Sequence, residues 1–174
     1  ELRERQALTI PYFEFREVLA VRPADRDRFR TLSDLAGRRI ATLGSTTAYQ
    51  ILLDEQVRAK VVPVSYDDDV HPYTDLVAGR VDAVLLDHII AQRRLRVLGG
   101  FVIQPEPVAT GHYVGVLARA NVALRDSVNA ILRERMRDGS LEKIFRNWDV
   151  WDDAQSKYFA RVLADTSAAA ARTA

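Results

Sequence analysis

The 174-residue sequence contains no cysteine, which excludes disulfide scaffolds, zinc sites built from thiolates and cysteine nucleophiles. Its apolar runs are short, as at residues 18–21, whereas a membrane-spanning helix needs about 18 apolar residues in a row. It also has no excess of charge of one sign, with 25 Lys and Arg against 24 Asp and Glu. Such a balance does not provide the basic surface that nucleic acids require, so we expect no nucleic-acid partner.

The composition is that of a folded protein, with 48% hydrophobic and 28% charged residues. Neither of the glycine-rich phosphate-binding motifs, G-x-G-x-x-G and G-x-x-x-x-G-K-[ST], occurs in it. The three histidines lack the spacing of metal ligands, and no G-x-S-x-G elbow marks a serine hydrolase. We therefore expect neither a cofactor nor a metal, and no catalytic residue.

Short apolar segments alternate with segments of helical periodicity along most of the chain. Strands are predicted at residues 13–21, 40–43, 61–64, 81–86, 101–103 and 113–118. Helices are predicted at residues 48–53, 72–78, 87–95, 124–136, 140–148 and 151–164. Alternation of this kind is typical of parallel βαβ units, so the sequence predicts an α/β fold.

A turn rich in hydroxyl groups joins the strand at 40–43 to the helix that follows. Its residues Ser45, Thr46 and Thr47 lie where the free backbone N–H groups of a helix N-terminus are available to an anion such as a carboxylate. The alternative is purely structural, since Thr46 is also a good N-cap residue for the helix.

Asp87 follows the apolar strand at 81–86, and ligand-contacting residues of open α/β sheets lie at such carboxyl ends of strands. A carboxylate in that place can receive an ammonium group. The alternative is again a helix cap, because Asp is a common N-cap residue and a helix is predicted to start there.

Several further segments stand in a characteristic order: residues 9–13 (TIPYF), 32–41 (LSDLAGRRIA), 45–47 (STT), 76–87 (LVAGRVDAVLLD), 114–116 (VGV), 138–140 (DGS) and Trp148. Taken in this order, they resemble family 3 of the bacterial extracellular solute-binding proteins, the polar amino-acid receptors of ABC importers. Each piece alone is weak, but their order and spacing extend over residues 1 to about 151.

The resemblance implies a periplasmic-binding-protein-like fold of type II, with two α/β lobes joined by two crossing strands. Residues 20–112 then form a complete second lobe, residues 1–19 and 113–150 part of the first lobe, and residues 151–174 a C-terminal extension. Because the family's first lobe starts with elements that have no counterpart here, the chain is expected to be part of a longer protein.

The resemblance also implies roles for individual residues. In that family the hydroxyl turn at Thr46 and Thr47 holds the α-carboxylate of the amino acid, and the acid at the position of Asp87 takes its α-ammonium. In the family, an arginine upstream of the Pro-Tyr strand is the main charge partner of the carboxylate. Arg3 corresponds to this arginine when the alignment is shifted by one residue.

The implied function is that of the substrate-binding component of an ABC importer for a polar amino acid or a similar small zwitterion, and not that of an enzyme. Its partner would be a membrane permease, separate or fused, and its location periplasmic or otherwise extracytoplasmic, although no signal peptide is visible. Two alternatives share the fold: a sensor or channel ligand domain, and an enzyme similar to periplasmic cyclohexadienyl or arogenate dehydratases. For the enzyme, the sequence offers Asp87 but no clear second catalytic carboxylate.

Overall fold

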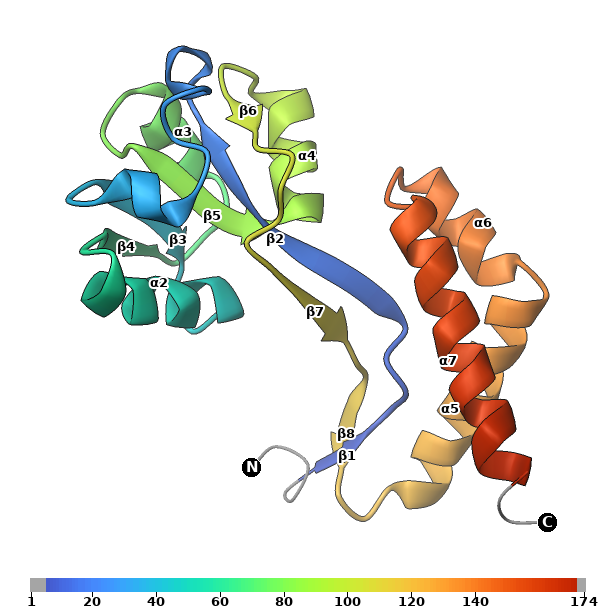
Figure 1. The fold of residues 1–174 in the computed structure, drawn as a ribbon. Coiled ribbons are helices and arrows are strands. Elements are labelled where there is room, and N and C mark those ends of the chain that lie inside the picture. Colours follow the sequence, from blue (N-terminus) through green and yellow to red (C-terminus); the bar gives the residue numbers. More distant parts are fainter. Residues whose placement is uncertain (1–5, 172–174) are drawn as a thin grey trace. The chain divides into compact units, whose positions relative to one another are not determined.

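The computed structural model describes residues 6–171, with side chains described to residue 164 (Figure 1). Contacts within the chain divide it into two compact units. Unit 1 consists of residues 1–14 and 112–174, and unit 2 of residues 15–111. Both junctions fall inside strands, so the chain passes from one unit to the other along β2 (Phe13–Val21) and β7 (Ala109–Tyr113).

Unit 2 is built around a six-stranded sheet whose strand order is β4-β3-β5-β2-β6, with β7 paired to β2. Besides β2 and β7, its elements are η1 (Pro23–Asp25), η2 (Leu32–Leu35), β3 (Arg39–Leu43), α2 (Thr47–Arg58), β4 (Val62–Tyr66), α3 (His71–Val77), β5 (Ala83–Asp87), α4 (His88–Val97) and β6 (Val102–Ile103). The α2 helix packs on β3 and β4, α3 on β3 and β5, and α4 on β5 and β6. The predicted strands and helices of this unit are thus confirmed, with small shifts of their ends.

The core of unit 2 lies between this sheet and its helices. In β2, burial alternates at first and then becomes continuous, because the strand enters the middle of the sheet where both faces are covered. Leu19 of β2, Ile40 of β3 and Leu85 of β5 are fully buried, as are Leu52 of α2 and Leu76 of α3. This packing gives the carboxyl ends of β3 and β5 a rigid support.

The sheet is mixed, and only part of it consists of the parallel βαβ units that the alternation of segments predicted. Strand β3 pairs in parallel with β4 and β5, but β2 is antiparallel to both β5 and β6. The reason is that β2 enters from unit 1 and is inserted between β5 and β6, two strands that α4 connects. The prediction of an α/β fold with parallel βαβ units is therefore correct for β3, β4 and β5, and it does not describe β2.

Unit 1 contains a two-stranded antiparallel sheet, β1 (Gln6–Leu8) with β8 (Val116–Ala118), and three helices. The helices are α5 (Val122–Arg137), α6 (Ser140–Asn147) and α7 (Asp153–Ala171), with α5 packed against α6, α7 and β1 (Figure 1). Met136, Tyr158 and Phe159 form the buried centre of this unit, and Phe145 and Trp151 pack against them. Residues 151–164, expected as a C-terminal extension, thus contribute to this cluster.

The strand predicted at residues 113–118 is two strands, β7 and β8. The break occurs because the pairing partner changes from β2 to β1. Between the two strands, Gly115 N–H donates to Thr9 Oγ1 (2.7 Å) and Thr9 N–H donates to Gly115 O (2.9 Å). A change of pairing partner does not alter the hydrophobicity of the segment, so the sequence alone does not reveal it.

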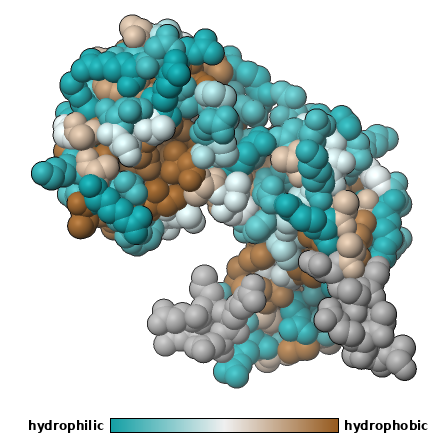
Figure 2. Space-filling view, in the orientation of Figure 1, coloured by the Kyte–Doolittle hydropathy of each residue, from teal (hydrophilic) through white to brown (hydrophobic). Residues whose placement is uncertain are grey.

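On the face shown in Figure 2 most of the surface is hydrophilic, and hydrophobic residues, shown brown, gather in a patch on unit 2. On unit 1 the large exposed ones are Val116, Val122, Leu124, Ile131, Ile144 and Trp148. Within the described residues, no helix is both long and apolar enough to cross a membrane.

Candidate functional site

The two segments singled out from the sequence leave the sheet of unit 2 at the same edge. Strands β3 and β5 are parallel neighbours, with Ile40 opposite Ala83 and Ala41 opposite Val84. Continuing this register brings the turn after Leu43 opposite Asp87. Neighbouring strands lie about 4.8 Å apart. The hydroxyl turn and the Asp87 carboxyl are therefore brought together at one carboxyl edge of the sheet, where open α/β sheets bind ligands.

The turn between β3 and α2 is held in a defined shape by Thr46. Its Oγ1 accepts a hydrogen bond from Tyr49 N–H (3.1 Å) and donates one to Leu43 O (2.7 Å). The structural alternative for Thr46, a helix N-cap, is thus what the structure contains. Ser45 and Thr47 on either side are exposed and carry the other two hydroxyls of the turn.

The backbone of the turn comes close to the neighbouring strand. Ser45 has a φ of 59°, in the left-handed region. At Gly44, a Cβ atom would lie 2.8 Å from Ser65 Oγ of β4, so a larger residue there would have to displace the Ser65 hydroxyl. The turn therefore presents hydroxyls and the N-terminal amides of α2, the groups that bind anions at a helix start.

Asp87 is the last residue of β5 and stands at the N-cap position of α4. Its side chain makes no capping hydrogen bond to that helix, so the structural alternative proposed for Asp87 is wrong. The residue is partly exposed. Its carboxyl instead accepts a hydrogen bond from the carboxyl of Glu17 in β2, its cross-strand neighbour.

Glu17 is the residue that the sequence analysis missed. It is only 1% exposed, and among the described residues no group makes a hydrogen bond to its Oε2. Burial, followed by the charge of Asp87 and a hydrogen bond to it, raises the pKa of Glu17 to about 8. Glu17 is therefore mostly protonated at neutral pH, and the pair holds one negative charge. The sequence did contain one indication of Glu17, because a carboxylate stands there inside a strand that becomes buried on both faces.

Tyr73 of α3 lies close enough to Glu17 and Asp87 for their charges to affect its pKa. Its side chain is fully buried and its hydroxyl has no hydrogen-bond partner among the described residues. Burial and then the charges of Asp69, Asp87 and Glu17 raise the pKa of Tyr73, so the phenol stays neutral. Asp69 itself is paired with Arg94, and the carboxyl pair thus lies beside buried polar groups rather than in a purely apolar core.

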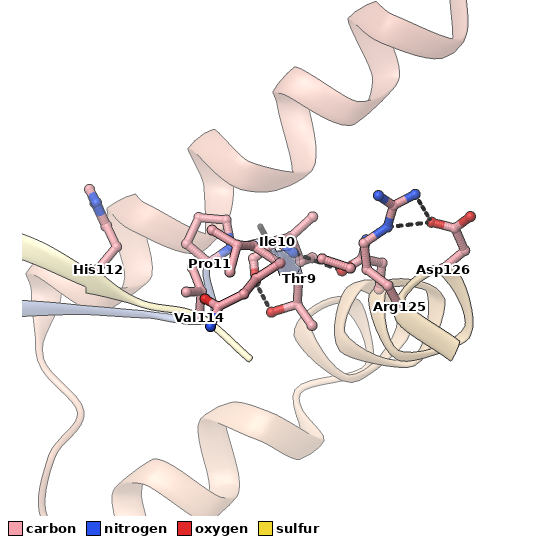
Figure 3. Close-up of a pocket in the computed structure, with 11 residues that line it drawn as sticks. Thr9, Ile10, Pro11, His112, Val114, Arg125 and Asp126 are labelled. Carbon is pink, nitrogen blue, oxygen red and sulfur yellow. Dashed lines mark hydrogen bonds and ion pairs between the residues drawn. The ribbon is translucent and has the colours of Figure 1, made fainter. Parts of the chain in front are cut away.

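Unit 1 has a separate hollow between the segment after β1 and helix α5 (Figure 3). Thr9, Ile10 and Pro11 form one side of it, and Arg125 and Asp126 of α5 form another. These last two side chains are paired with each other (2.7 Å), so their charges compensate. Among the described residues, the predicted site residues Ser45, Thr46, Thr47 and Asp87 do not line this hollow.

Arg3, the third predicted ligand contact, lies outside the described residues. Within residues 6–171 no group of three or more His, Cys, Asp or Glu side chains is arranged to hold a metal ion.

Comparison with known proteins identifies relatives over most of the chain, although no family model matches it. The arginine-binding protein 1 of an Escherichia coli K12 ABC transporter is 29% identical over 153 residues, which are 85% of this chain and 61% of that protein. The L-cystine-binding protein TcyJ of the same strain is 27% identical over 149 residues, covering 85% of this chain and 55% of the relative. The chain therefore spans little more than half the length of these relatives.

Solved structures show the same relationship. An ancestral arginine-binding protein bound to arginine has a TM-score of 0.74 and 26% sequence identity. The match covers 84% of this chain and 65% of that one. The expected fold class, that of the amino-acid-binding proteins, is thereby confirmed.

Proposed function

The chain is a homologue of the family 3 extracellular solute-binding proteins that serve ABC importers, and from this premise we propose that it binds a polar amino acid for import. The observation that carries the proposal is the common edge of β3 and β5, where a hydroxyl-rich turn at a helix N-terminus and a carboxyl follow adjacent strands. An amino acid is a zwitterion, with one group of each charge a short distance apart. The edge offers hydrogen-bond donors for the carboxylate and a carboxyl for the ammonium group.

The carboxylate of the amino acid is assigned to the turn. The start of α2 provides backbone N–H groups and the positive end of a twelve-residue helix, and Ser45 and Thr47 add exposed hydroxyls. Thr46 contributes by fixing the turn, since its own hydroxyl already makes two hydrogen bonds. The α-ammonium is assigned to Asp87.

These groups alone account for weak binding only. Micromolar affinity requires about 8 kcal/mol. A charge-assisted hydrogen bond contributes about 1.5 to 3 kcal/mol, and a helix N-terminus about 0.3 to 2 kcal/mol. Further contacts are therefore needed, and Arg3 is our candidate for a charge partner of the carboxylate.

The relatives also suggest the setting in which such a receptor acts. We propose that the protein works outside the cytoplasm and delivers its amino acid to a membrane permease, separate or fused. Ligand binding then shifts the protein towards the state that the permease recognises. Arginine is the first ligand to test, because the E. coli relative and the ancestral protein are both named for arginine.

Isothermal titration calorimetry on the intact protein tests the proposal. The twenty proteinogenic L-amino acids and L-cystine are titrated one by one, with prephenate and a dicarboxylic acid as non-zwitterionic controls. We expect saturable binding of at least one amino acid in the micromolar range or tighter. An absence of binding across the whole set would remove the receptor function.

One observation favours a second candidate, an acid-catalysed elimination in the same site. The sequence offered no second carboxylate for such chemistry, but the structure contains Glu17 next to Asp87, with a pKa raised to about 8 by burial and by Asp87. A protonated acid at neutral pH is what a general acid requires. Incubation with prephenate distinguishes the two candidates: consumption by the wild type and its loss in Glu17→Gln would favour the enzyme, and no consumption would exclude this reaction.

A further inference from the structure

We propose that Glu17 is a second carboxyl of the ammonium subsite, and that it releases its proton to solvent when the cationic group of a ligand binds beside Asp87. The inference rests on the proposed function and deepens it. With two carboxyls, the site should prefer primary ammonium or guanidinium groups, because these carry several N–H donors. Binding should also depend on pH, because Glu17 loses a proton.

The geometry of the pair is the first support. Glu17 and Asp87 are Cα partners in the antiparallel ladder of β2 and β5. Side chains of such partners point to the same face of a sheet, with Cβ atoms about 4.5 to 5.5 Å apart. Asp87 is partly exposed at the end of its strand, whereas Glu17 is 99% buried behind it. A cation that reaches Asp87 therefore lies within Coulombic range of both carboxyls.

The second support is an unused acceptor. Glu17 Oε2 is buried and has no hydrogen-bond partner among the described residues, an arrangement that costs stability. The neighbouring Tyr73 hydroxyl is buried and unpartnered as well. Two orphaned polar atoms next to a partly exposed acid are typical of a site that is completed by a ligand, since buried polar groups are otherwise satisfied.

Other titratable and charged groups face the pair from the surrounding helices. From α3 and the loop before it, these are Tyr73, kept neutral, and Asp69, paired with Arg94 of α4. From α4 there is also His88, which is 4% exposed and whose Nδ1 accepts a hydrogen bond from the backbone N–H of Arg16.

The proton balance follows directly. In the free protein the carboxylic acid of Glu17 donates to the Asp87 carboxylate. When an ammonium arrives, the O–H bond of Glu17 breaks, the proton goes to the buffer, and both carboxylates accept N–H donors of the ligand. An opposite charge at this distance lowers the pKa of a carboxyl by about 1 to 3 units. In the ligand-free protein the pKa of Glu17 is raised to about 8, so about half of the Glu17 side chains are protonated at pH 8. Close to half a proton should therefore leave per ligand bound at that pH.

Calorimetry on the intact protein measures this release. L-Arginine, or the tightest-binding amino acid of the screen above if arginine does not bind, is titrated at pH 8 in buffers of low and high ionisation enthalpy. The dependence of the observed heat on the buffer gives the number of protons released. The same titrations are made with Glu17→Gln and with a control, Glu55→Gln, which removes a carboxylate of α2 that is paired with Arg58.

We expect release of about half a proton in the wild type and in Glu55→Gln, and none in Glu17→Gln. Wild-type affinity should rise by up to about tenfold per pH unit between pH 6 and pH 8, because each unit of pH removes the competing proton. Heats independent of the buffer, or equal release in Glu17→Gln, would overturn the inference and leave the receptor function standing. If no amino acid binds to the wild type, both proposals fail. Should Glu17→Gln not fold, the wild-type release at pH 8 decides alone.

Discussion

Glu17 and Asp87 lie opposite each other on the antiparallel strands β2 and β5, one almost completely buried and the other partly exposed. The pair connects the core of unit 2 to the edge at which we propose ligand binding. Two carboxyls this close do not both ionise at neutral pH, and the buried one keeps the proton. The consequences reach both the stability of the protein and its affinity for a cation.

Stability should decrease with rising pH because of Glu17. Its pKa is 4.5 without perturbation and about 8 in the folded protein, so between these values the folded state binds more protons than the unfolded state. By linkage, the stabilisation is complete below pH 4.5 and is lost as the pH rises towards 8, by up to about 1.4 kcal/mol per pH unit. Urea unfolding from pH 5 to pH 8 measures the free energy of unfolding, and Glu17→Gln should flatten its slope. An unchanged slope in that variant would contradict the assignment.

Asp87→Asn should weaken amino-acid binding at least tenfold, because the amide cannot attract the ligand's ammonium by charge. A factor of ten corresponds to about 1.4 kcal/mol. The matched control is Asp54→Asn, an exposed carboxylate of α2 that accepts a hydrogen bond from Gln50, and it should bind as the wild type does. Calorimetry at pH 7 gives both dissociation constants. Equal affinity of Asp87→Asn and the wild type would remove Asp87 from the site.

Replacement of Thr46 by valine should lower stability, because Tyr49 N–H loses its acceptor and Leu43 O loses a donor. N-cap losses cost about 0.5 to 2 kcal/mol. Thr46→Ser keeps the hydroxyl and should stay within about 0.5 kcal/mol of the wild type in urea unfolding. If valine and serine at this position are equally stable, the hydroxyl does not hold the turn.

Gln155 of α7 should be important for the stability of unit 1. It is fully buried, and its Oε1 accepts from Glu14 N–H (3.2 Å) while its Nε2 donates to Glu14 O. Gln155→Leu leaves both backbone groups without these partners and should cost about 1 to 3 kcal/mol. Gln50→Leu, on the exposed face of α2, is the control and should change the free energy of unfolding much less. Equal effects of the two variants would show that the link to α7 is dispensable.

The location of the candidate site could be predicted from the sequence because it follows from strand ends. The apolar runs before the hydroxyl turn and before Asp87 are clear, and the carboxyl ends of parallel strands meet at one edge. Glu17 could not be found in this way. Its contact with Asp87 depends on the antiparallel insertion of β2 next to β5, and the alternation of segments predicted parallel pairing.

The division of the segment at 113–118 likewise depends on pairing between distant strands. Local periodicity reports whether a residue is buried, but not which strand buries it. Segment 113–118 is continuous in hydrophobicity, yet the structure divides it where its partner changes from β2 to β1. Pairings between segments some hundred residues apart, such as Thr9 with Gly115, have no local signature.

The central claim is that one zwitterion is bound at both ends, its carboxylate at residues 45–47 and its ammonium at Asp87. Calorimetry with the amino acid that binds most tightly, its N-acetyl derivative and its carboxamide tests this most directly. We expect both blocked forms to bind at least tenfold more weakly than the free amino acid, with the N-acetyl form insensitive to Asp87→Asn. Blocked forms that bind as tightly as the free amino acid would contradict the account.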